Sequence, residues 1–294
     1  MDLADLRVFE AVARLGGMNR ASAELNMVQS NVTARIRLLE DRLGVPLFER
    51  HSRGVSLTGA GQRLLPFAVE AQRLLEDARR AVTDDGTPKG SLTIGSLETT
   101  AALRLSPLLT RYAALYPAVD LVLRTGTSQE MIEAVVEHRL EGAFVCGPVR
   151  HRDLDETVIF REELVVVTAP AMPSLTGLAT RSDLKLVVFR AGCSYRQRLE
   201  ALLARRGLVG LRLLEFGTLD AIIGCIAAGI GLSLLPRAVV APAAEAGRVR
   251  IHDLPVADAQ VETVFVSRAG TYRSHALAAF LDLGSASASE GLAA

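Results

Sequence analysis

Apolar residues recur at helical spacing near the amino terminus. One set follows intervals of four, three and four residues, which places its members on a single helix face: Val32, Ile36, Leu39 and Leu43. Gly44 is expected to end this helix because glycine tolerates a positive φ, and Pro46 prevents the helix from resuming. The pattern predicts an amphipathic helix with one buried face and one polar face.

Two shorter helices and a hairpin are expected around this helix. The first helix carries an apolar stripe and ends at Gly16-Gly17; the stripe consists of Leu3, Leu6, Phe9, Val12 and Ala13. The second is expected to begin at Asn19, a residue type that caps helix amino termini, and its small residues allow close packing. Residues 47–57 hold two extended runs around Ser52-Arg53-Gly54, which predicts a basic hairpin.

The polar face of the third helix carries groups that suit DNA. Glutamine can pair with adenine through two hydrogen bonds, and arginine can bind guanine or a phosphate. Two helices at a tight turn followed by a basic hairpin are typical of a winged helix-turn-helix. The candidate DNA-contacting residues are Asn19, Arg20, Gln29, Ser30, Asn31, Thr33, Ala34, Arg35, Arg37, Arg50 and Arg53.

An alternative interpretation is a helical bundle without a nucleic-acid role, because amphipathic helices joined by short turns are common. Charge separates the two interpretations weakly. Residues 1–65 hold nine arginines and no lysine against seven acidic residues, a net charge of +2. Any positive surface in this segment is therefore local.

The segment from Met18 to Gly61 resembles the DNA-binding domain of LysR-type transcriptional regulators. The resemblance rests on the Ala-rich helix, the Gln-led helix, Leu-Gly-Val-Pro-Leu-Phe-Glu-Arg at 43–50 and Leu-Thr-Gly-Ala-Gly at 57–61. Gly-Ser-Leu-Thr-Ile-Gly at 90–95 resembles the start of that family's effector-binding domain. The segments 25–36 and 189–200 resemble a branch of the family whose effectors are poorly defined. The chain departs from the family at Ser30-Asn31 and Ala34-Arg35, so its operator cannot be copied from a relative.

A long helix is predicted after the hairpin. Thr58 can cap it, it continues to about Thr83, and Pro66 should bend it. Its apolar stripe needs a partner, and the stripe consists of Leu64, Ala68, Ala71, Leu75, Ala78 and Val82. The resemblance implies pairing of these helices across a homodimer, whereas the alternative is packing on the helix's own domain. Polar residues at 84–90 predict a hinge.

Strands and helices alternate from residue 91 onward. Strands are expected at 92–96, 119–124, 142–146, 163–168, 186–189, 211–216, 232–235 and 262–267, with helices at about 101–116, 128–138, 195–206, 219–228 and 272–282. This alternation predicts α/β layers with largely parallel sheets. By resemblance, the last helix returns to the first lobe, which gives the two-lobed architecture of periplasmic binding proteins.

Ligands of such sheets bind beyond the carboxyl ends of the strands, where helix amino termini present N–H groups. These positions predict an effector site formed by Ser96, Thr99, Thr100, Thr125, Thr127, Ser128, Cys146, Gly147, Cys193, Ser194, Arg196 and Thr218. Hydroxyls and free amides suit a small anion or polar metabolite. Serine and threonine at such junctions also serve as simple helix caps, and Glu98 would oppose an anionic ligand.

Two alternatives concern the cysteines. A thiol at a helix amino terminus, as at Cys193, can have a lowered pKa, which would allow a redox or thiol-reactive sensor with Cys146 across the cleft. Enzymes on this kind of fold offer a second alternative, with Glu98 and Cys193 as the candidate pair. The sequence has no phosphate loop, HExxH or CxxC motif, so neither catalysis, a metal nor a cofactor is expected.

Length and composition agree with a multidomain cytoplasmic protein. The 294 residues exceed what one core usually fills, and the net charge is zero with 33 basic and 33 acidic residues. Three cysteines, an odd number, favour a reducing compartment. Secretion is not expected, because the first residues lack the pattern of a signal peptide. The apolar tract 221–236 is shorter than the roughly 20 residues that a membrane span needs.

We predict three regions along the chain. A DNA-binding domain covers 1–58, a linker helix and hinge cover 59–87, and an effector-binding domain covers 88–294. The lobes of the effector-binding domain are expected at about 91–161 plus 267–284 and at about 162–266.

The expected partners follow from the resemblance. They are double-stranded promoter or operator DNA, a small-molecule effector and further copies of the chain, with dimers joined by the linker helix and paired into a homotetramer by the effector lobes. RNA polymerase is a further candidate partner, and no membrane association is expected.

Overall fold

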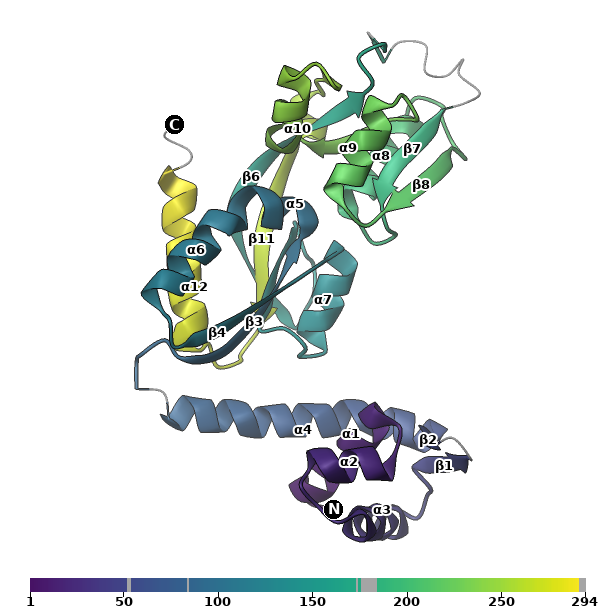
Figure 1. Cartoon of the computed structure of the whole chain (residues 1–294), viewed down its shortest axis with the longest axis vertical. Helices are drawn as coiled ribbons and strands as arrows, with labels where there is room; N and C mark the ends of the chain where they lie inside the picture. The colour runs from purple at the N-terminus through teal and green to yellow at the C-terminus, as the bar shows by residue number, and fades with distance from the viewer. Residues whose placement is uncertain (52–53, 84, 173, 176–183, 291–294) are drawn as a thin grey trace. The chain divides into compact units, whose positions relative to one another are not determined.

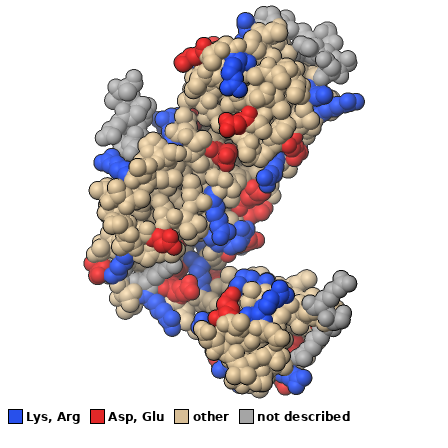
Figure 2. Space-filling view, in the orientation of Figure 1, with Lys and Arg blue, Asp and Glu red and all other residues tan. Residues whose placement is uncertain are grey.

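The chain folds as two compact units, Met1–Asp85 and Gly86–Ala294 (Figure 1). The computed structural model describes residues 1–51, 54–83, 85–172, 174–175 and 184–290. None of the helices in this described part of the chain combines the length and apolar character that crossing a membrane requires. On the face shown in Figure 2, acidic and basic groups are interspersed over both units.

The amino-terminal unit contains three helices, a hairpin and a long helix: α1 (Leu3–Leu15), α2 (Met18–Glu24), α3 (Gln29–Leu43), β1 (Phe48–His51), β2 (Gly54–Leu57) and α4 (Gly59–Thr83). Strands β1 and β2 pair antiparallel, as the sequence predicts for the wing. Asp2 and Asp5 form a capping box at the start of α1, and Gly16 ends this helix in the left-handed conformation with φ of 64°.

Helix α3 forms where the apolar pattern places it. Val32, Ile36 and Leu39 are buried in the core of this unit, and Gly44 ends the helix with φ of 71°. Leu43 is 38% exposed, so the buried stripe is one residue shorter than predicted. The prediction that Asn19 caps α2 is wrong. Gly17 occupies that position, because the left-handed turn at Gly16 lets α2 begin two residues earlier than expected.

Helix α4 divides its apolar stripe between two environments. The Thr58 hydroxyl caps the helix by accepting a hydrogen bond from the Gly61 N–H at 3.1 Å, as predicted. Ala68 is buried in the core of the amino-terminal unit, whereas Val82 is 86% exposed. The first half of the stripe therefore packs on its own domain, as the alternative interpretation held, and the second half faces outward.

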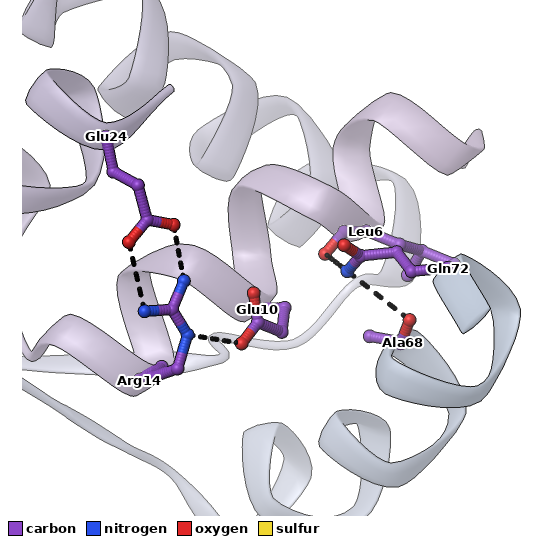
Figure 3. A network of polar contacts seen from close by, with 6 residues as sticks. All are labelled: Leu6, Glu10, Arg14, Glu24, Ala68 and Gln72. Atoms are coloured by element: carbon purple, nitrogen blue, oxygen red, sulfur yellow. Dashed lines mark hydrogen bonds and ion pairs between the residues drawn. The ribbon is translucent and has the colours of Figure 1, made fainter. Parts of the chain in front are cut away.

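Side-chain contacts fasten α1 to its neighbours (Figure 3). Gln72 of α4 donates from Nε2 to the carbonyl oxygens of Leu6, at 3.5 Å, and Ala68, at 3.4 Å. Arg14 of α1 forms ion pairs with Glu10 on the same helix and with Glu24 on α2. These contacts join α1, α2 and α4 into one packed unit.

The second unit has a seven-stranded sheet in the order β10-β6-β11-β5-β3-β4, with β9 on β6, and a separate β7-β8 pair. The strands are β3 (Gly90–Leu97), β4 (Val119–Gly126), β5 (Gly142–Cys146), β6 (Leu154–Thr168), β7 (Lys185–Phe189), β8 (Arg212–Phe216), β9 (Ser233–Pro236), β10 (Arg250–His252) and β11 (Gln260–Arg268). The helices are α5 (Glu98–Thr100), the π-helical η1 (Ala101–Leu105), α6 (Ser106–Leu115), α7 (Ser128–Val136), α8 (Ser194–Ala204), α9 (Leu219–Ala227), α10 (Arg237–Glu245), α11 (Val256–Ala259) and α12 (His275–Glu290).

The unit is a two-lobed α/β fold in which β6 and β11 run from one lobe into the other (Figure 1). The expectation of largely parallel sheets holds for β3 with β4 and β5, and for β7 with β8. It is wrong for the ladders that β6 forms with β9, β10 and β11, and for β11 with β5, which are antiparallel. The reason is that β6 and β11 carry the chain between the lobes in opposite directions.

The last helix, α12, packs beside α6 in the first lobe, where Phe280 is fully buried. The Phe280 ring meets Tyr112 edge-on, with the ring centroids 5.2 Å apart. The Tyr112 hydroxyl donates to the Ala276 carbonyl at 2.7 Å, and burial raises the pKa of Tyr112 to about 12. This aromatic cluster fixes the end of the described chain onto the lobe that begins at β3.

Candidate functional sites

The polar face of α3 is open to solvent. Gln29, Ser30, Asn31, Ala34 and Arg37 are exposed, and Thr33 is half-buried. No ion pair joins Arg37 to another residue in the described part of the chain, so its guanidinium is available to a partner. The buried stripe of α3 turns this polar face outward.

A hollow beside this face is lined by residues of α3, α2 and the wing. Residues at its wall include the predicted Asn19, Arg20, Gln29 and Thr33, and also His51, which the sequence analysis missed. His51 could have been noticed as a polar residue beside the predicted turn of the wing. The structure thus places four predicted residues next to the wing.

The wing is held against the end of α1. The Val55 N–H donates to the Gly16 carbonyl oxygen at 3.2 Å. Gly54 has φ of +139°, and a Cβ atom there would lie 2.5 Å from the Gly16 oxygen. Arg50 lies in β1 opposite Val55, and Arg53 lies outside the described residues.

Arg35 forms an ion pair with a residue of α1. Its Nη1 atom lies 3.1 Å from Oδ1 of Asp5, a residue of α1, and Arg42 reaches Oδ2 of the same carboxylate at 3.1 Å. Arg35 therefore lies between the buried and exposed faces of α3, whereas the sequence pattern had grouped it with the DNA-contacting residues.

A cavity of about 400 Å³ lies between the two lobes of the second unit. The first lobe contributes the ends of β3 and β4 and the start of α7, and the second lobe contributes the ends of β7 and β8 and the start of α8. This is the strand-end location expected for an α/β ligand site. The predicted residues that line it are Thr99, Thr125, Thr127, Ser128, Cys146, Cys193 and Ser194.

Five predicted residues do not line this cavity. Ser96 is fully buried and donates to the Leu97 carbonyl oxygen at 3.0 Å, and Thr100, the residue after Thr99, is also buried. Gly147 packs against Val264, since a Cβ atom on the glycine would lie 2.7 Å from it.

The other two are exposed or engaged. Thr218 is an exposed residue that precedes α9. Arg196 forms ion pairs with Glu200 at 3.1 Å and with Glu215 at 2.6 Å. These carboxylates explain a cation in the first turn of α8 without a ligand.

The lobes touch directly beside the cavity. Ser194 of α8 donates from its hydroxyl to the Ser128 hydroxyl of α7 at 3.1 Å, and Ser128 accepts from the Cys146 N–H at 3.3 Å. The Gln129 N–H donates to the Gly192 carbonyl oxygen at 3.4 Å. Gly192 has φ of +91°, which favours glycine at this crossing point.

Several cavity residues were missed by sequence reasoning. Arg124 lies near the end of β4 and Arg190 directly after β7, and both are exposed. The Arg190 guanidinium lies over Gly217, where a Cβ atom would be 2.8 Å from its Nη2. Strand-end position could have identified both arginines. Tyr195 is also a wall residue, and its burial raises the pKa of its hydroxyl, which hydrogen-bonds with Thr99.

The two cavity cysteines do not have the properties of reactive thiols. Burial raises the pKa of Cys193, although hydrogen bonds from the Arg196 and Tyr195 N–H groups at the start of α8 act in the opposite direction. Burial likewise raises the pKa of Cys146. The expected lowering of the Cys193 pKa is therefore wrong, because the loss of hydration at the buried thiol raises the pKa more than the helix amino terminus lowers it. The redox alternative is not favoured.

The Glu98 and Cys193 pair of the enzyme alternative does line the cavity. A reactive pair would need a thiolate, and the raised pKa of Cys193 opposes its formation. Within the described residues, no group of three or more His, Cys, Asp or Glu side chains is placed to hold a metal ion. The cavity is thus lined by hydroxyl groups and by charged side chains.

Comparison with known proteins assigns both units to the same family. The family described as "Bacterial regulatory helix-turn-helix protein, lysR family" matches residues 3–62, and "LysR substrate binding domain" matches residues 85–288. The HTH-type transcriptional regulator GltR of Bacillus subtilis (strain 168) is 43% identical over 281 residues, which are 96% of this chain and 95% of that protein.

Solved structures share the fold. ArgP from Mycobacterium tuberculosis gives a TM-score of 0.72 at 19% identity and covers 98% of each chain. Full-length CbnR in complex with its target DNA gives a TM-score of 0.51 at 24% identity, covering 98% of this chain and 100% of that one. The chain belongs to the LysR family of transcriptional regulators, with an amino-terminal DNA-binding helix-turn-helix and a carboxyl-terminal effector-binding domain.

Proposed function

We propose that this regulator reads promoter DNA with the exposed face of α3 and the wing, and that a small polar or anionic effector in the inter-lobe cavity changes this contact. The observation that carries the DNA part is the open polar face of α3 beside a docked hairpin, with an Arg37 guanidinium that forms no ion pair within the described residues. Gln29 and Thr33 lie on the same face, with Nε2 and Oγ1 3.4 Å apart. These groups match base edges and phosphates.

Arg37→Ala is expected to weaken specific DNA binding by about 1–3 kcal/mol, or roughly 5- to 150-fold, because a charge-assisted contact in the groove is lost. The measurement is fluorescence anisotropy with a duplex obtained by in vitro selection on the full-length wild-type protein. Arg206→Ala serves as the matched control, since Arg206 is an exposed arginine of the other unit. Equal effects of the two substitutions would remove Arg37 from the interface.

The linker helix supports a dimer. Phe67, Ala71, Leu74, Ala78 and Ala81 follow the alternating spacing of four and three residues that two-stranded coiled coils use. Phe67 is 67% exposed, and Leu74 and Ala78 are also exposed. We infer that this seam pairs two chains and that the effector lobes pair dimers into a tetramer. Two recognition helices would then meet successive turns of the duplex.

The cavity supports a polar effector. Hydroxyl groups of Thr99, Thr125, Ser128 and Ser194 line its walls, and Arg124 and Arg190 supply positive charge from opposite lobes. The carboxylates of Glu98, Glu130 and Glu133 also line the cavity, so a ligand that carries an anionic group beside hydrogen-bond donors fits the wall chemistry best. Closure of the lobes around such a molecule would shift the orientation of the attached DNA-binding units.

Thr99→Val is expected to raise the effector dissociation constant about tenfold, because the cavity wall loses a hydroxyl that also holds Tyr195. Thr100→Val is the matched control: it carries the same change one residue along, outside the cavity wall. A thermal-shift screen of small carboxylates, amino acids and sulfur oxyanions first identifies a ligand, which is then titrated into each variant by calorimetry. Weaker binding by the Thr100 variant alone would reverse the assignment.

The relatives are transcriptional regulators, which supports a role without catalysis. A regulator of promoters works where the DNA lies, so we place its action in the cytoplasm. RNA polymerase is the partner that a change of DNA bend or of half-site contact would affect.

A further inference from the structure

Asp5 is a buried charged residue in the amino-terminal unit. It lies in the first turn of α1 and is only 2% exposed. Its Oδ2 atom accepts from the Asp2 N–H at 3.1 Å, and its own N–H donates to Asp2 Oδ1 at 2.8 Å. The capping box therefore fixes the direction of the Asp5 carboxylate through contacts within α1 and its N-cap alone.

Two arginines of α3 share this carboxylate. Arg35 binds Oδ1 and Arg42 binds Oδ2, each at 3.1 Å through Nη1. The two residues are seven positions apart, so at about 100° per residue they lie on one side of the helix, two turns from each other. Arg37 lies about 200° around the helix from Arg35 and faces outward.

The arrangement restrains rotation and sliding of α3. One carboxylate that binds two turns of a helix opposes a turn of that helix about its axis, because a rotation that carries Arg35 away from Asp5 carries Arg42 away as well. A carboxylate this buried needs its positive partners, since an unpaired buried charge is costly. The apolar stripe of α3 sets which face is inside, and the ion pairs add a fixed register.

We propose that Asp5 is a positioning residue for the recognition helix and that Arg35 and Arg42 act on DNA binding through it rather than by contact with DNA. The proposal rests on the DNA interface proposed above. It gives Arg35 a different role from the one that the sequence pattern predicts. Specific binding, which requires aligned base contacts, then depends on Asp5 more than non-specific binding does.

The test compares Asp5→Asn, Arg35→Gln and Arg37→Gln in the full-length protein. Affinity is measured for the selected duplex and for an unrelated duplex of equal length over a series of salt concentrations. Arg37→Gln is expected to reduce the slope of log K against log salt concentration by about one, because the protein then brings one cation fewer to the DNA. Arg35→Gln is expected to leave that slope unchanged and to lower the ratio of specific to non-specific affinity about tenfold.

For Asp5→Asn, a purely electrostatic effect and a loss of helix position would change the affinity for DNA in opposite directions. Removal of a negative charge near a DNA-binding face would by itself tighten binding, whereas loss of helix position weakens specific binding. We expect the selected duplex to bind about tenfold more weakly and the unrelated duplex at least as tightly as to the wild type. Tighter binding of both duplexes would overturn the proposal, as would a reduced salt slope for Arg35→Gln.

Two further variants, Arg42→Gln and Arg35→Lys, protect the test against simple unfolding, and Arg42→Gln is expected to behave like Arg35→Gln. Arg35→Gln and Arg42→Gln each leave the carboxylate with one arginine, so the test does not depend on Asp5→Asn if that variant fails to fold. Thermal unfolding of each variant checks its fold, and Arg35→Lys should recover only part of the lost specificity, because lysine keeps the charge but not the guanidinium geometry. An unchanged slope and affinity for Arg37→Gln would instead reject the DNA interface itself.

Discussion

Replacement of Arg104 by methionine is expected to lower the free energy of unfolding of the effector-binding domain by about 2–4 kcal/mol. Arg104, from η1, places its Nε atom 3.0 Å from Oε1 of Glu162 on β6, and its guanidinium lies 5.6 Å from the centre of the Phe160 ring. The Glu162 side chain is only 7% exposed. Methionine would remove the arginine that pairs with this carboxylate. The expected cost is below that of a fully enclosed pair because Arg104 retains contact with water.

The measurement is urea unfolding followed by circular dichroism. Arg161→Met is the matched control, because Arg161 lies on the same strand and its ion pair with Glu262 is open to solvent; it should cost less than about 1 kcal/mol. The double variant Arg104→Met with Glu162→Gln should recover part of the loss, since the buried charge is gone. If the Arg104 and Arg161 variants lost equal stability, the buried carboxylate would not be the cause.

Gly61→Ala is expected to destabilise the amino-terminal unit by about 1–3 kcal/mol and to impair DNA binding. A Cβ atom at this position would lie 2.3 Å from the Leu47 carbonyl oxygen and 2.8 Å from Cδ2 of Leu57. The Leu47 oxygen is held by a hydrogen bond from the Thr58 N–H at 3.0 Å, so it cannot withdraw freely. Helix α4 would have to move away from the hairpin, and the wing would move with it.

Gly59→Ala is the control for this substitution. It places the same methyl group on the same helix, where the nearest atom belongs to the flexible side chain of Arg63 at 3.6 Å. Because glycine in a helix is about 0.5–1 kcal/mol less stable than alanine, Gly59→Ala should be neutral or slightly stabilising. Thermal unfolding and anisotropy on the selected duplex compare the pair. Similar behaviour of the two variants would contradict the steric explanation.

The sequence predicts the elements best where one local pattern determines them. The stripe of Val32, Ile36 and Leu39 and the stop at Gly44 define α3, because helical spacing and a positive-φ glycine are local properties. Strands β3 to β5 were expected for the same reason, since short runs of apolar residues ended by turn residues mark them. Helix α10 was missed because Pro242 within it argues against a helix.

Contacts between distant segments could not be read in this way. A helical projection places Arg35 near the polar face of α3, but it contains no information on Asp5, which lies thirty residues earlier and binds it. The cavity shows the same limit: strand ends were located correctly, yet the choice between Thr99 and Thr100 depends on how the short helix α5 turns. The roles of these residues at DNA and effector remain predictions.

The contact between the lobes has an energetic consequence. A rotation that separates the start of α8 from the start of α7 would break the bond between Ser194 and Ser128 and the bond between Gln129 and Gly192. At a net worth of about 0.5–1.5 kcal/mol each, these two bonds set a threshold of about 1–3 kcal/mol. A molecule that shifts the lobes must prefer the rearranged form by roughly 5- to 150-fold merely to balance the equilibrium. The proposed effector would therefore have to distinguish the two forms, because a molecule that binds both equally shifts nothing however tightly it binds.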